Sequence, residues 1–342
     1  MSKRVLITGG AGFIGSHLAL YLLRHYPDYE VIVLDALTYA GNRANLREAE
    51  GNPRFRFIQA DVRNREAVHE AMQGVQFVAH LAAETHVDRS ILNPDAFITT
   101  DVYGTFVMLE MARHMPVERF LHVSTDEVYG AIESGVCTEE APLRPTSPYA
   151  ASKAGADLLA QAYCKTYHLP ILIVRPSNTF GARQYPEKLI PFFITRALND
   201  LPLPLYGDGQ QRRDWLYIDD HVRALDIVLH RGQPGEIYNI GANNERTNLE
   251  ITRNILQILG KPETLIQFVQ DRPAHDRRYA LNTDKIRALG WQPQADFDDA
   301  LHATVIWYVQ NRDWWEPIVR ERAEYQQFVE QWYGMRQSAS GR

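Results

Sequence analysis

Glycines at every third position of the segment Thr8–Gly15 constrain the fold of this chain more than any other feature. The segment contains Gly9, Gly12 and Gly15 and lies between an expected strand at 4–8 and an expected helix at 13–24. Glycine permits a tight turn and lets backbone amides approach a diphosphate at the positive end of the helix. The sequence therefore predicts a strand–turn–helix unit that binds a dinucleotide.

An acidic residue, Asp35, ends the second expected strand at 30–35, twenty residues after Gly15. A carboxylate at this place binds the adenosine ribose hydroxyls and repels a 2'-phosphate, so NAD is favoured over NADP. In the alternative interpretation, the glycines only make a turn and Asp35 caps a helix. The combined context favours an NAD site.

Two later strand ends offer further cofactor contacts. Asp61 and Val62 follow the strand expected at 55–59 and are candidates to contact adenine, although an ordinary strand-end turn explains them equally well. Leu81, Ala82 and Ala83 end the strand expected at 77–81, where small side chains leave room for a cofactor. A tight strand-to-helix junction would need the same residues.

Strands and helices alternate along the first half of the chain. Further strands are expected at 119–123 and 171–175, separated by segments of crossover length. This alternation predicts an α/β fold with a Rossmann-type doubly wound parallel sheet and a smaller C-terminal substrate-binding lobe. We expect an NAD-binding domain over 1–176 that carries the catalytic residues. The lobe is expected mainly over 177–335, with some segments returning to the first domain and helices at 219–230, 249–259 and 300–314.

Composition limits the class of protein. The 342 residues are 45% hydrophobic and 23% charged, as in ordinary globular proteins, and the net charge of -6 argues against a nucleic-acid partner. Cys137 and Cys164 are too few for a disulfide framework or a cysteine-rich metal site. No apolar run approaches membrane-spanning length. We expect a soluble, cytoplasmic protein without a metal and without a membrane partner.

Tyr149 and Lys153 form a Tyr-x-x-x-Lys pair, which shares one face of a helix. A nearby ammonium is expected to lower the pKa of the phenol, so that Tyr149 takes a hydroxyl proton while hydride leaves for NAD. The pair often occurs by chance on solvated helix faces. Its place after Pro148 and after the segment Ser124–Gly130 favours the catalytic interpretation.

Thr125, Asp126 and Glu127 follow the strand expected at 119–123. Ligands of such sheets bind beyond the carboxyl ends of the strands, so Thr125 is placed to contact the reacting hydroxyl, although it also suits a capping role. A simple oxidoreductase needs no further carboxyl groups here, whereas elimination needs one acid and one base. Asp126 and Glu127 therefore indicate elimination of water, although two carboxyls on a loop are often merely solvated.

The segments above resemble the extended short-chain dehydrogenase/reductase family, whose members act on nucleotide sugars. Within this family the chain is most similar to 4,6-dehydratases, over nearly its whole length. The segments that carry the likeness are Ala83–Ser90, Pro176–Gly181, Pro186–Pro191, Tyr206–Gly209, Arg213–Trp215, Asp271–Asp276, Trp307–Tyr308 and Asn311–Trp315. Glycine is expected where Ala274 stands.

The resemblance implies a nucleotide-diphosphate sugar substrate, with dTDP-glucose expected. Tyr149 would take the C4 hydroxyl proton with help from Thr125 while hydride passes to NAD. The C4 ketone acidifies C5, so Glu127 would remove the C5 proton and Asp126 would protonate the departing C6 hydroxyl. Hydride then returns to C6, which gives a 4-dehydro-6-deoxy sugar, a precursor in deoxysugar and rhamnose biosynthesis.

The resemblance also implies binding residues and a homodimer. Cofactor contacts are expected from Gly9, Gly12, Phe13, Ile14, Gly15, Asp35, Ala36, Leu37, Thr38, Asp61, Val62, Leu81, Ala82, Ala83, Thr100, Tyr149, Lys153 and Thr179. Substrate contacts are expected from Thr85, Asn178, Lys188, Leu189, Pro204, Tyr206, Arg213, Asn248, Arg272 and His275, with the basic side chains near the diphosphate and Tyr206 stacked on the base. The dimer would pack through the helix bearing Tyr149 and the helix after Pro94.

Three alternatives remain at this stage. A 4-epimerase would share NAD and the Tyr-x-x-x-Lys pair, but it has no need of Asp126 and Glu127. A 4,6-dehydratase of another nucleotide sugar, such as UDP-glucose, is harder to exclude because base recognition depends on the loop around Pro204 and Tyr206. A noncatalytic NAD-binding protein is disfavoured by the presence of all four reactive side chains.

Overall fold

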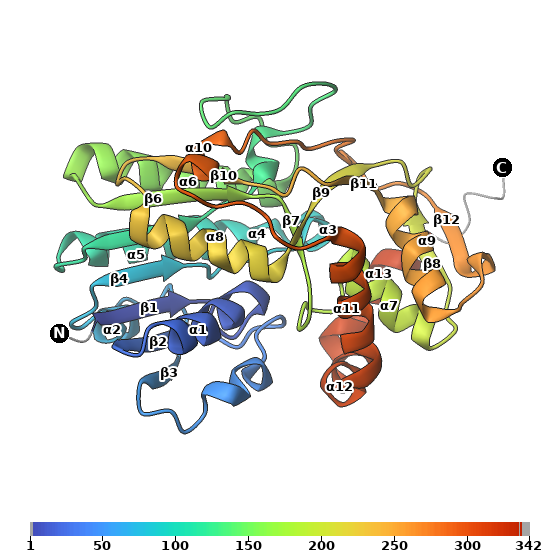
Figure 1. The fold of residues 1–342 in the computed structure, drawn as a ribbon, viewed down its shortest axis with the longest axis horizontal. Helices are drawn as coiled ribbons and strands as arrows, with labels where there is room; N and C mark the ends of the chain where they lie inside the picture. The colour runs from blue at the N-terminus through green and yellow to red at the C-terminus, as the bar shows by residue number, and fades with distance from the viewer. Residues whose placement is uncertain (1–2, 335, 337–342) are drawn as a thin grey trace.

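The computed structural model describes residues 3–334 and 336, and its largest element is a seven-stranded parallel sheet (Figure 1). The strands are β1 (Lys3–Thr8), β2 (Tyr29–Asp35), β3 (Phe55–Gln59), β4 (Phe77–His80), β5 (Arg119–Val123), β6 (Ile171–Pro176) and β10 (Ile237–Ile240). Their order is β10-β6-β5-β4-β1-β2-β3, and all neighbours are parallel. The predicted doubly wound α/β fold is confirmed, with the chain reversing direction across the sheet between β1 and β4.

Helices cover both faces of this sheet. In Figure 1, α1 (Phe13–His25) and α8 (Ile218–Arg231) lie in front of it, and α5 (Gly104–Arg113) and α6 (Pro148–Tyr167) lie behind it, where α2 (Arg65–Ala71) joins them in the core. Alternate residues of β1 explain the two layers, since Val5 and Ile7 pack under α1 while Leu6 packs under α2 and α5. Each such buried aliphatic side chain contributes roughly 1.5–3 kcal/mol to stability.

Several short helical segments connect the strands and the longer helices. Between β4 and α5 the chain forms α3 (Val87–Leu92), α4 (Pro94–Phe97) and a π-helical segment, η2 (Ile98–Tyr103). The 3-10 segments are η1 (Arg43–Ala49), η3 (Asp126–Tyr129) and η4 (Glu263–Leu265). Of these, η2 and η3 line the site described below.

The second half of the chain builds the smaller lobe. A three-stranded sheet contains β7 (Asn178–Phe180), β9 (Arg212–Tyr217) and β11 (Glu245–Thr247), and a two-stranded sheet pairs β8 (Leu203–Tyr206) with β12 (Ile266–Val269). The helices of this lobe are α7 (Leu189–Leu198), α9 (Asn248–Leu259), α11 (Phe297–Gln310), α12 (Arg312–Glu321) and α13 (Ala323–Gly334). By contrast, α8, β10 and α10 (Asp284–Ala288) pack with the large sheet.

The predicted single helix at 300–314 is wrong. Asp296 caps α11 at Phe297, because its carboxylate accepts hydrogen bonds from two backbone amides of the first turn. The helix ends at Gln310, where Asn311 leaves the helical conformation and its side-chain amide donates to the carbonyl of Trp307. The indole of Trp315, in α12, then donates to the carbonyl of Tyr308, which turns the chain back onto α11.

Candidate active site

The glycine turn between β1 and α1 leaves space beside the end of β4. Gly9 has a φ of +68°, and a Cβ atom there would lie 2.8 Å from Cα of Ala82. A Cβ atom on Gly15 would lie 2.3 Å from the carbonyl oxygen of Gly9. Gly12 precedes α1 without a side-chain cap, so the amides of the first turn remain available to an anion. This turn fits the diphosphate of a dinucleotide.

Asp35 lies buried at the end of β2, beside the glycine turn. Its two carboxylate oxygens accept hydrogen bonds from the backbone amides of Ala11 and Leu37, each at 2.8 Å. Burial raises the pKa of Asp35, and these amide bonds oppose the rise. Because each oxygen has a second lone pair, the carboxylate is still able to accept hydrogen bonds from ribose hydroxyls.

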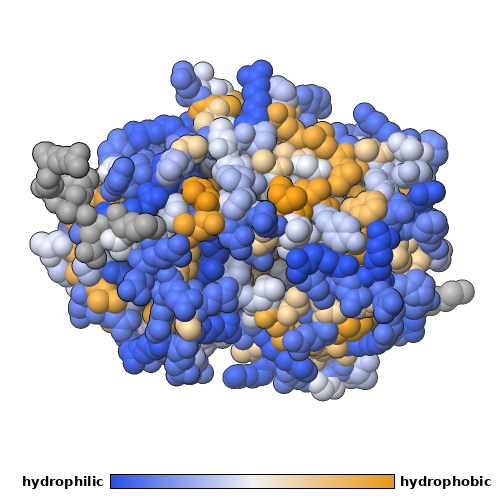
Figure 2. All heavy atoms as spheres, turned by 180° about the vertical axis from the view of Figure 1, so that it is seen from behind, coloured by the Kyte–Doolittle hydropathy of each residue, from blue (hydrophilic) through white to orange (hydrophobic). Residues whose placement is uncertain are grey.

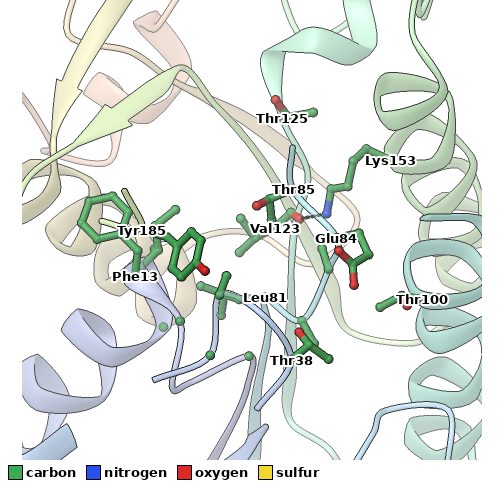
Figure 3. A pocket seen from close by; sticks show the side chains of 18 of the residues that line it. Phe13, Thr38, Leu81, Glu84, Thr85, Thr100, Val123, Thr125, Lys153 and Tyr185 are labelled. Carbon is green, nitrogen blue, oxygen red and sulfur yellow. Dashed lines mark hydrogen bonds between the residues drawn. The ribbon is translucent and has the colours of Figure 1, made fainter. Parts of the chain in front are cut away.

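A cavity of about 360 Å³ extends from this turn to the ends of β5 and β6. In Figure 3, Phe13 and Tyr185 lie on one side of it, and Lys153, Glu84 and Thr100 lie on the other. The predicted cofactor residues that line it are Gly9, Gly12, Phe13, Ile14, Gly15, Asp35, Ala36, Thr38, Asp61, Val62, Leu81, Ala82, Ala83, Thr100, Tyr149, Lys153 and Thr179. Leu37 is not among the lining residues, and its side chain packs against the core beneath α1.

Thr125 links the end of β5 to η3, and the acidic pair follows it along the cavity. The Thr125 hydroxyl accepts a hydrogen bond from the backbone amide of Glu127 at 3.3 Å and caps the turn. The same hydroxyl donates to Oδ1 of Asp126 at 3.2 Å. The second carboxyl oxygen of Asp126 is buried and has no hydrogen-bond partner among the described residues.

Tyr149 and Lys153 reach the same cavity from the first turns of α6. Ser147 caps this helix by accepting from the amide of Ala150, and Pro148 occupies its first position, so helical backbone begins directly before Tyr149. The ammonium of Lys153 is buried and donates to the carbonyl of Val123 at 2.7 Å, as the dashed line in Figure 3 marks. The five predicted catalytic side chains are thus brought together.

The two neighbouring carboxyls have different surroundings. Burial and the adjacent charge of Glu127 raise the pKa of Asp126 well above its usual range, although Arg213 and the hydrogen bond with Thr125 oppose the rise. Burial also raises the pKa of Glu127, but Arg272, Arg213 and Lys188 oppose that rise. This difference favours a protonated Asp126 beside a Glu127 that ionises more readily.

The sequence-based expectation for the phenol of Tyr149 is wrong for the protein alone. Burial raises the pKa of Tyr149 well above its usual range, and the charges of Glu127 and Asp101 act in the same direction. A hydrogen bond with Thr125 opposes the rise. The spacing of the pair could not reveal these effects, because they depend on burial and on residues distant in sequence.

Two neighbouring carboxyls, Asp101 and Glu84, were not predicted. Asp101 in η2 is buried. It accepts hydrogen bonds from the backbone amide of Glu84 at 2.8 Å and from the hydroxyl of Ser152 at 2.6 Å. Burial raises the pKa of Asp101 to about 6. Glu84 lines the cavity, and burial together with Asp101 raises its pKa to about 7. The place of Glu84 directly after Ala83, beyond a strand end, was the available sequence signal.

Three of the predicted substrate residues line the cavity: Thr85, Asn178 and Lys188. The ammonium of Lys188 donates to the carbonyl of Thr85, which joins the α7 side of the lobe to the segment after β4. Oδ1 of Asn178 is buried without a hydrogen-bond partner among the described residues. These groups offer donors and acceptors at the lobe end of the cavity.

The other predicted substrate residues lie beyond the cavity lining. Arg272 donates to Oδ1 of Asp88 at 2.9 Å, and the hydroxyl of Tyr206 donates to Oδ2 of the same carboxylate at 2.7 Å. Arg213 donates to the carbonyl of Asp276 at 2.8 Å. The remaining positions are Leu189 at the start of α7, Pro204 in β8, Asn248 at the start of α9, and His275, whose ring contacts Asp271 at 2.6 Å. The charges of Arg213 and Arg272 both act on Glu127, so this cluster adjoins the acidic pair.

Residues 3–334 and 336 contain neither a metal-binding cluster nor a membrane-spanning helix. Within these residues no group of three or more His, Cys, Asp or Glu side chains is arranged to hold a metal ion. The helices of the same part of the chain are each too short or too polar to cross a membrane.

Known proteins resemble this chain over most of its length. The model of the family described as GDP-mannose 4,6 dehydratase matches residues 6–304. A dTDP-glucose 4,6-dehydratase of an Actinoplanes species is 48% identical, over 91% of this chain and 99% of the relative. A trifunctional enzyme of Arabidopsis thaliana, named first for UDP-glucose 4,6-dehydratase activity, is 43% identical over 92% of this chain and 48% of its own length.

A solved structure shows the same architecture. The crystal structure of DesIV, a dTDP-glucose 4,6-dehydratase from Streptomyces venezuelae with NAD and a second ligand bound, matches with a TM-score of 0.90. The two sequences are 52% identical, and the match covers 92% of this chain and 99% of that chain.

Proposed function

The chain belongs to the GDP-mannose 4,6 dehydratase family, and we propose that it is an NAD-dependent hydro-lyase that acts on dTDP-glucose. The product is dTDP-4-dehydro-6-deoxy-glucose. The observation that carries this proposal is the buried Asp126–Glu127 pair beside Thr125, Tyr149 and Lys153 in one cavity. An oxidation site with an added acid and an added base is what dehydration through a ketone requires.

The glycine turn and the residues around it fit NAD. The first-turn amides of α1 would bind the diphosphate, Asp35 the adenosine ribose and Lys153 the nicotinamide ribose. When bound, NAD takes the hydride from C4 and later returns it to C6, and its positive charge favours the phenolate form of Tyr149. No net oxidation results, so the cofactor has no need to leave between turnovers.

Tyr149 removes the proton of the C4 hydroxyl, and Thr125 shares the hydrogen bond to that oxygen. The buried ammonium of Lys153 stabilises the negative charge that forms on the phenol. Its own pKa is lowered by burial, while Asp101 and Asp157 counter that effect and favour the charged form. The result is a ketone at C4.

Glu127 and Asp126 then carry out the elimination. The ketone acidifies C5, because the electrons of the C5–H bond delocalise into an enolate, and Glu127 takes that proton. Asp126, protonated in its buried place, donates to the C6 oxygen as the C6–O bond breaks and water leaves. The proton on Glu127 exchanges with solvent at this stage, and after hydride reaches C6, Glu127 protonates C5. A proton that passes from Tyr149 to Asp126 by way of Thr125 restores the starting state.

A 4,6-dehydratase that acts on UDP-glucose is the nearest alternative. The Arabidopsis relative is named for that substrate and is nearly as similar as the dTDP-glucose enzymes. A 4-epimerase is less well supported because it would leave the acidic pair unused, and a noncatalytic NAD-binding protein would leave all the reactive groups unused. The base contacts near Pro204 and Tyr206 decide between the sugar nucleotides.

Incubation with dTDP-, UDP-, GDP- and CDP-hexoses tests the proposal. We expect dTDP-glucose to give the fastest conversion to a product lighter by one water, with the alkaline absorbance of a 4-keto-6-deoxy sugar. Tyr149→Phe keeps the ring but lacks the hydroxyl, so it serves as an inactive control. An epimerised sugar of unchanged mass would contradict the proposal.

The chain is further proposed to act as a cytoplasmic homodimer in deoxysugar synthesis, for example of rhamnose. Ile98 and Tyr103 in η2 and Leu158 in α6 are 50%, 44% and 54% exposed, on segments that pack against each other. Figure 2 shows hydrophobic residues gathered in patches on the side of the molecule where α5 and α6 lie. Both cysteines are free, as suits a reducing compartment.

A further inference from the structure

Arg175 is a buried cation at the end of β6 and lies outside the reactive groups described above. It is 1% exposed, and its guanidinium makes four hydrogen bonds. Nε and one terminal nitrogen donate to the two oxygens of Asp157, each at 2.9 Å. The other terminal nitrogen donates to the hydroxyl of Tyr129 at 2.8 Å and to the carbonyl of Glu139 at 3.1 Å. A planar guanidinium that makes a two-point contact fixes its partners in direction as well as distance.

The partners of Arg175 belong to the two elements that carry the reactive side chains. Asp157 lies in α6, one turn after Lys153 and two turns after Tyr149, on the same helix face. Tyr129 is the last residue of η3, two positions after Glu127. The chain that follows Arg175 runs through β7, which bears Asn178 and Thr179. One side chain therefore connects the Tyr149–Lys153 helix, the Asp126–Glu127 turn and a strand that lines the cavity.

A second set of bonds holds Tyr129 from the opposite side. Its hydroxyl donates to Oδ1 of Asn239 in β10 at 2.8 Å. The backbone amide of Asn239 in turn donates to the carboxylate of Glu139 at 2.9 Å. Because η3 is a single short turn, its orientation depends on such side-chain anchors rather than on helix length.

A buried ion pair is expensive to desolvate and is weak evidence for stability by itself. The desolvation cost of the Arg175–Asp157 pair is explained if the pair fixes the geometry of other groups. Here the Arg175–Asp157 pair and Tyr129 set the position of η3 against α6. The reaction needs the reactive side chains of both elements to reach the same sugar ring.

We propose that Arg175, with Asp157 and Tyr129, is a positioning device that holds the acidic pair in register with Tyr149 and Lys153. This inference rests on the proposed function. Oxidation at C4 depends on α6 and the end of β5, whereas elimination also needs η3 in its place. Removing the hydrogen bond between Arg175 and Tyr129 should therefore slow elimination more than oxidation. A displacement of a reacting group by about 1 Å lowers the rate by up to roughly 100-fold.

Tyr129→Phe is the sharpest test, because it removes the hydroxyl but keeps the ring, on which the Arg175 guanidinium lies 4.9 Å from the centroid. In single-turnover reactions with dTDP-glucose, NADH absorbance rises with oxidation and decays with elimination and hydride return. We expect the rise to stay within about 2-fold of wild type and the decay to slow about 10-fold or more, so that NADH accumulates. Tyr163→Phe is the matched control, since that hydroxyl in α6 binds Glu110 at 2.7 Å and should change neither phase.

Asp157→Asn supplies a second variant, because it weakens the α6 side of the same contact while it preserves shape. We expect it to slow the rise of NADH as well, since Tyr149 and Lys153 depend on that helix. If the rise and the decay of NADH in Tyr129→Phe were both unchanged, or were slowed equally, the positioning role would be overturned. A wild-type enzyme that forms neither NADH nor a dehydrated product would instead overturn the proposed function on which the inference rests.

Discussion

Asp126 and Glu127 are adjacent carboxyls that the fold places in different electrostatic surroundings. Arg213 of the lobe opposes the rise in pKa of both carboxyls, whereas Arg272 and Lys188 add to this opposition at Glu127. The lobe therefore does more than bind a substrate. It contributes the positive charge that separates an acid from a base.

Ala274 occupies a backbone conformation that favours glycine, with a φ of +50°. The left-handed conformation costs a non-glycine residue about 1–2 kcal/mol, and glycine loses about 0.4–1 kcal/mol more conformational freedom on folding. We therefore expect Ala274→Gly to leave unfolding free energy unchanged or to raise it by about 1 kcal/mol. Ala131→Gly, in an exposed loop, should lower it. Denaturant unfolding of both variants tests this prediction. It would be contradicted if Ala274→Gly lowered the free energy of unfolding as much as Ala131→Gly does.

Glu84 gives the protein a predictable pH dependence. Burial and Asp101 raise its pKa from 4.5 to about 7, and Glu187, Arg89 and Glu324 also act on it. Because the folded state holds this proton more tightly, the stabilisation is complete below pH 4.5 and is lost as the pH rises through 7. The melting temperature of wild type relative to Glu84→Gln should therefore fall between pH 4.5 and 8.

An exposed carboxyl provides the control for this pH effect. Glu133→Gln, in a surface loop, is the control variant for the same measurement over the same range. A constant difference for Glu84→Gln would show that its proton does not distinguish the folded from the unfolded state.

The motifs located the reactive residues because local spacing determines them. The glycine turn, the Tyr-x-x-x-Lys pair and the acidic pair all line one cavity, as expected from strand ends that meet at one edge of a parallel sheet. The pKa of Tyr149 and the network around Arg175 were not predictable. They depend on residues brought from β6, β10 and η2, which no local pattern connects.

At the scale of elements, α13 joins the lobe to the segment after β4. Trp332 donates from its indole nitrogen to the hydroxyl of Tyr206 at 2.5 Å, and Phe328 lies under the guanidinium of Arg89 at 4.4 Å. The helix lies beyond residue 304, where the family model ends. It contacts the predicted base-stacking residue, so we expect it to influence nucleotide affinity.

Trp332→Phe tests the role of α13. The variant loses the bond that orients the ring of Tyr206. We expect dTDP binding to weaken by about 3–10-fold, because a misoriented ring loses part of the roughly 1–3 kcal/mol that stacking on a base contributes. Calorimetric titration with dTDP measures this change. Trp307→Phe, in α11, should leave the affinity unchanged. If Trp332→Phe bound dTDP as tightly as wild type, α13 would have no influence on nucleotide affinity.

The helices of the lobe show why its elements were harder to predict than those of the sheet. The strands of the first domain and its first helix, α1, follow hydrophobic periodicity and were expected within a few residues. The break at Asn311 depends on a side-chain bond to Trp307 and on the docking of Trp315, both of which are specific contacts. The return of α8 and β10 to the large sheet likewise depends on long-range packing.

At the scale of the whole molecule, the exposed apolar residues of η2 and α6 lead to a prediction of assembly. Leu158→Glu places a charge in the proposed dimer interface and should convert dimer to monomer. Leu201→Glu, at an exposed position of the lobe, should remain dimeric. Sedimentation velocity of both variants decides the matter, and a monomeric wild type would contradict the dimer.

The large sheet and the lobe together explain how one cofactor serves three steps. The sheet holds the dinucleotide turn, Thr125 and the Tyr149–Lys153 helix, while the lobe brings Lys188, Arg213 and Arg272 to the acidic pair. Oxidation, elimination and reduction can then occur on a substrate that stays in one place. The central claim is that C4 oxidation serves to acidify C5 for removal of its proton by Glu127.

Hydrogen exchange at C5 tests this claim most directly. Wild-type enzyme and Glu127→Gln are each incubated with dTDP-glucose in deuterated water, and the sugar is analysed by mass spectrometry and NMR. We predict deuterium at C5 of the wild-type product, and no exchange at C5 with Glu127→Gln, although NADH still forms. Exchange at the wild-type rate in Glu127→Gln would contradict the account.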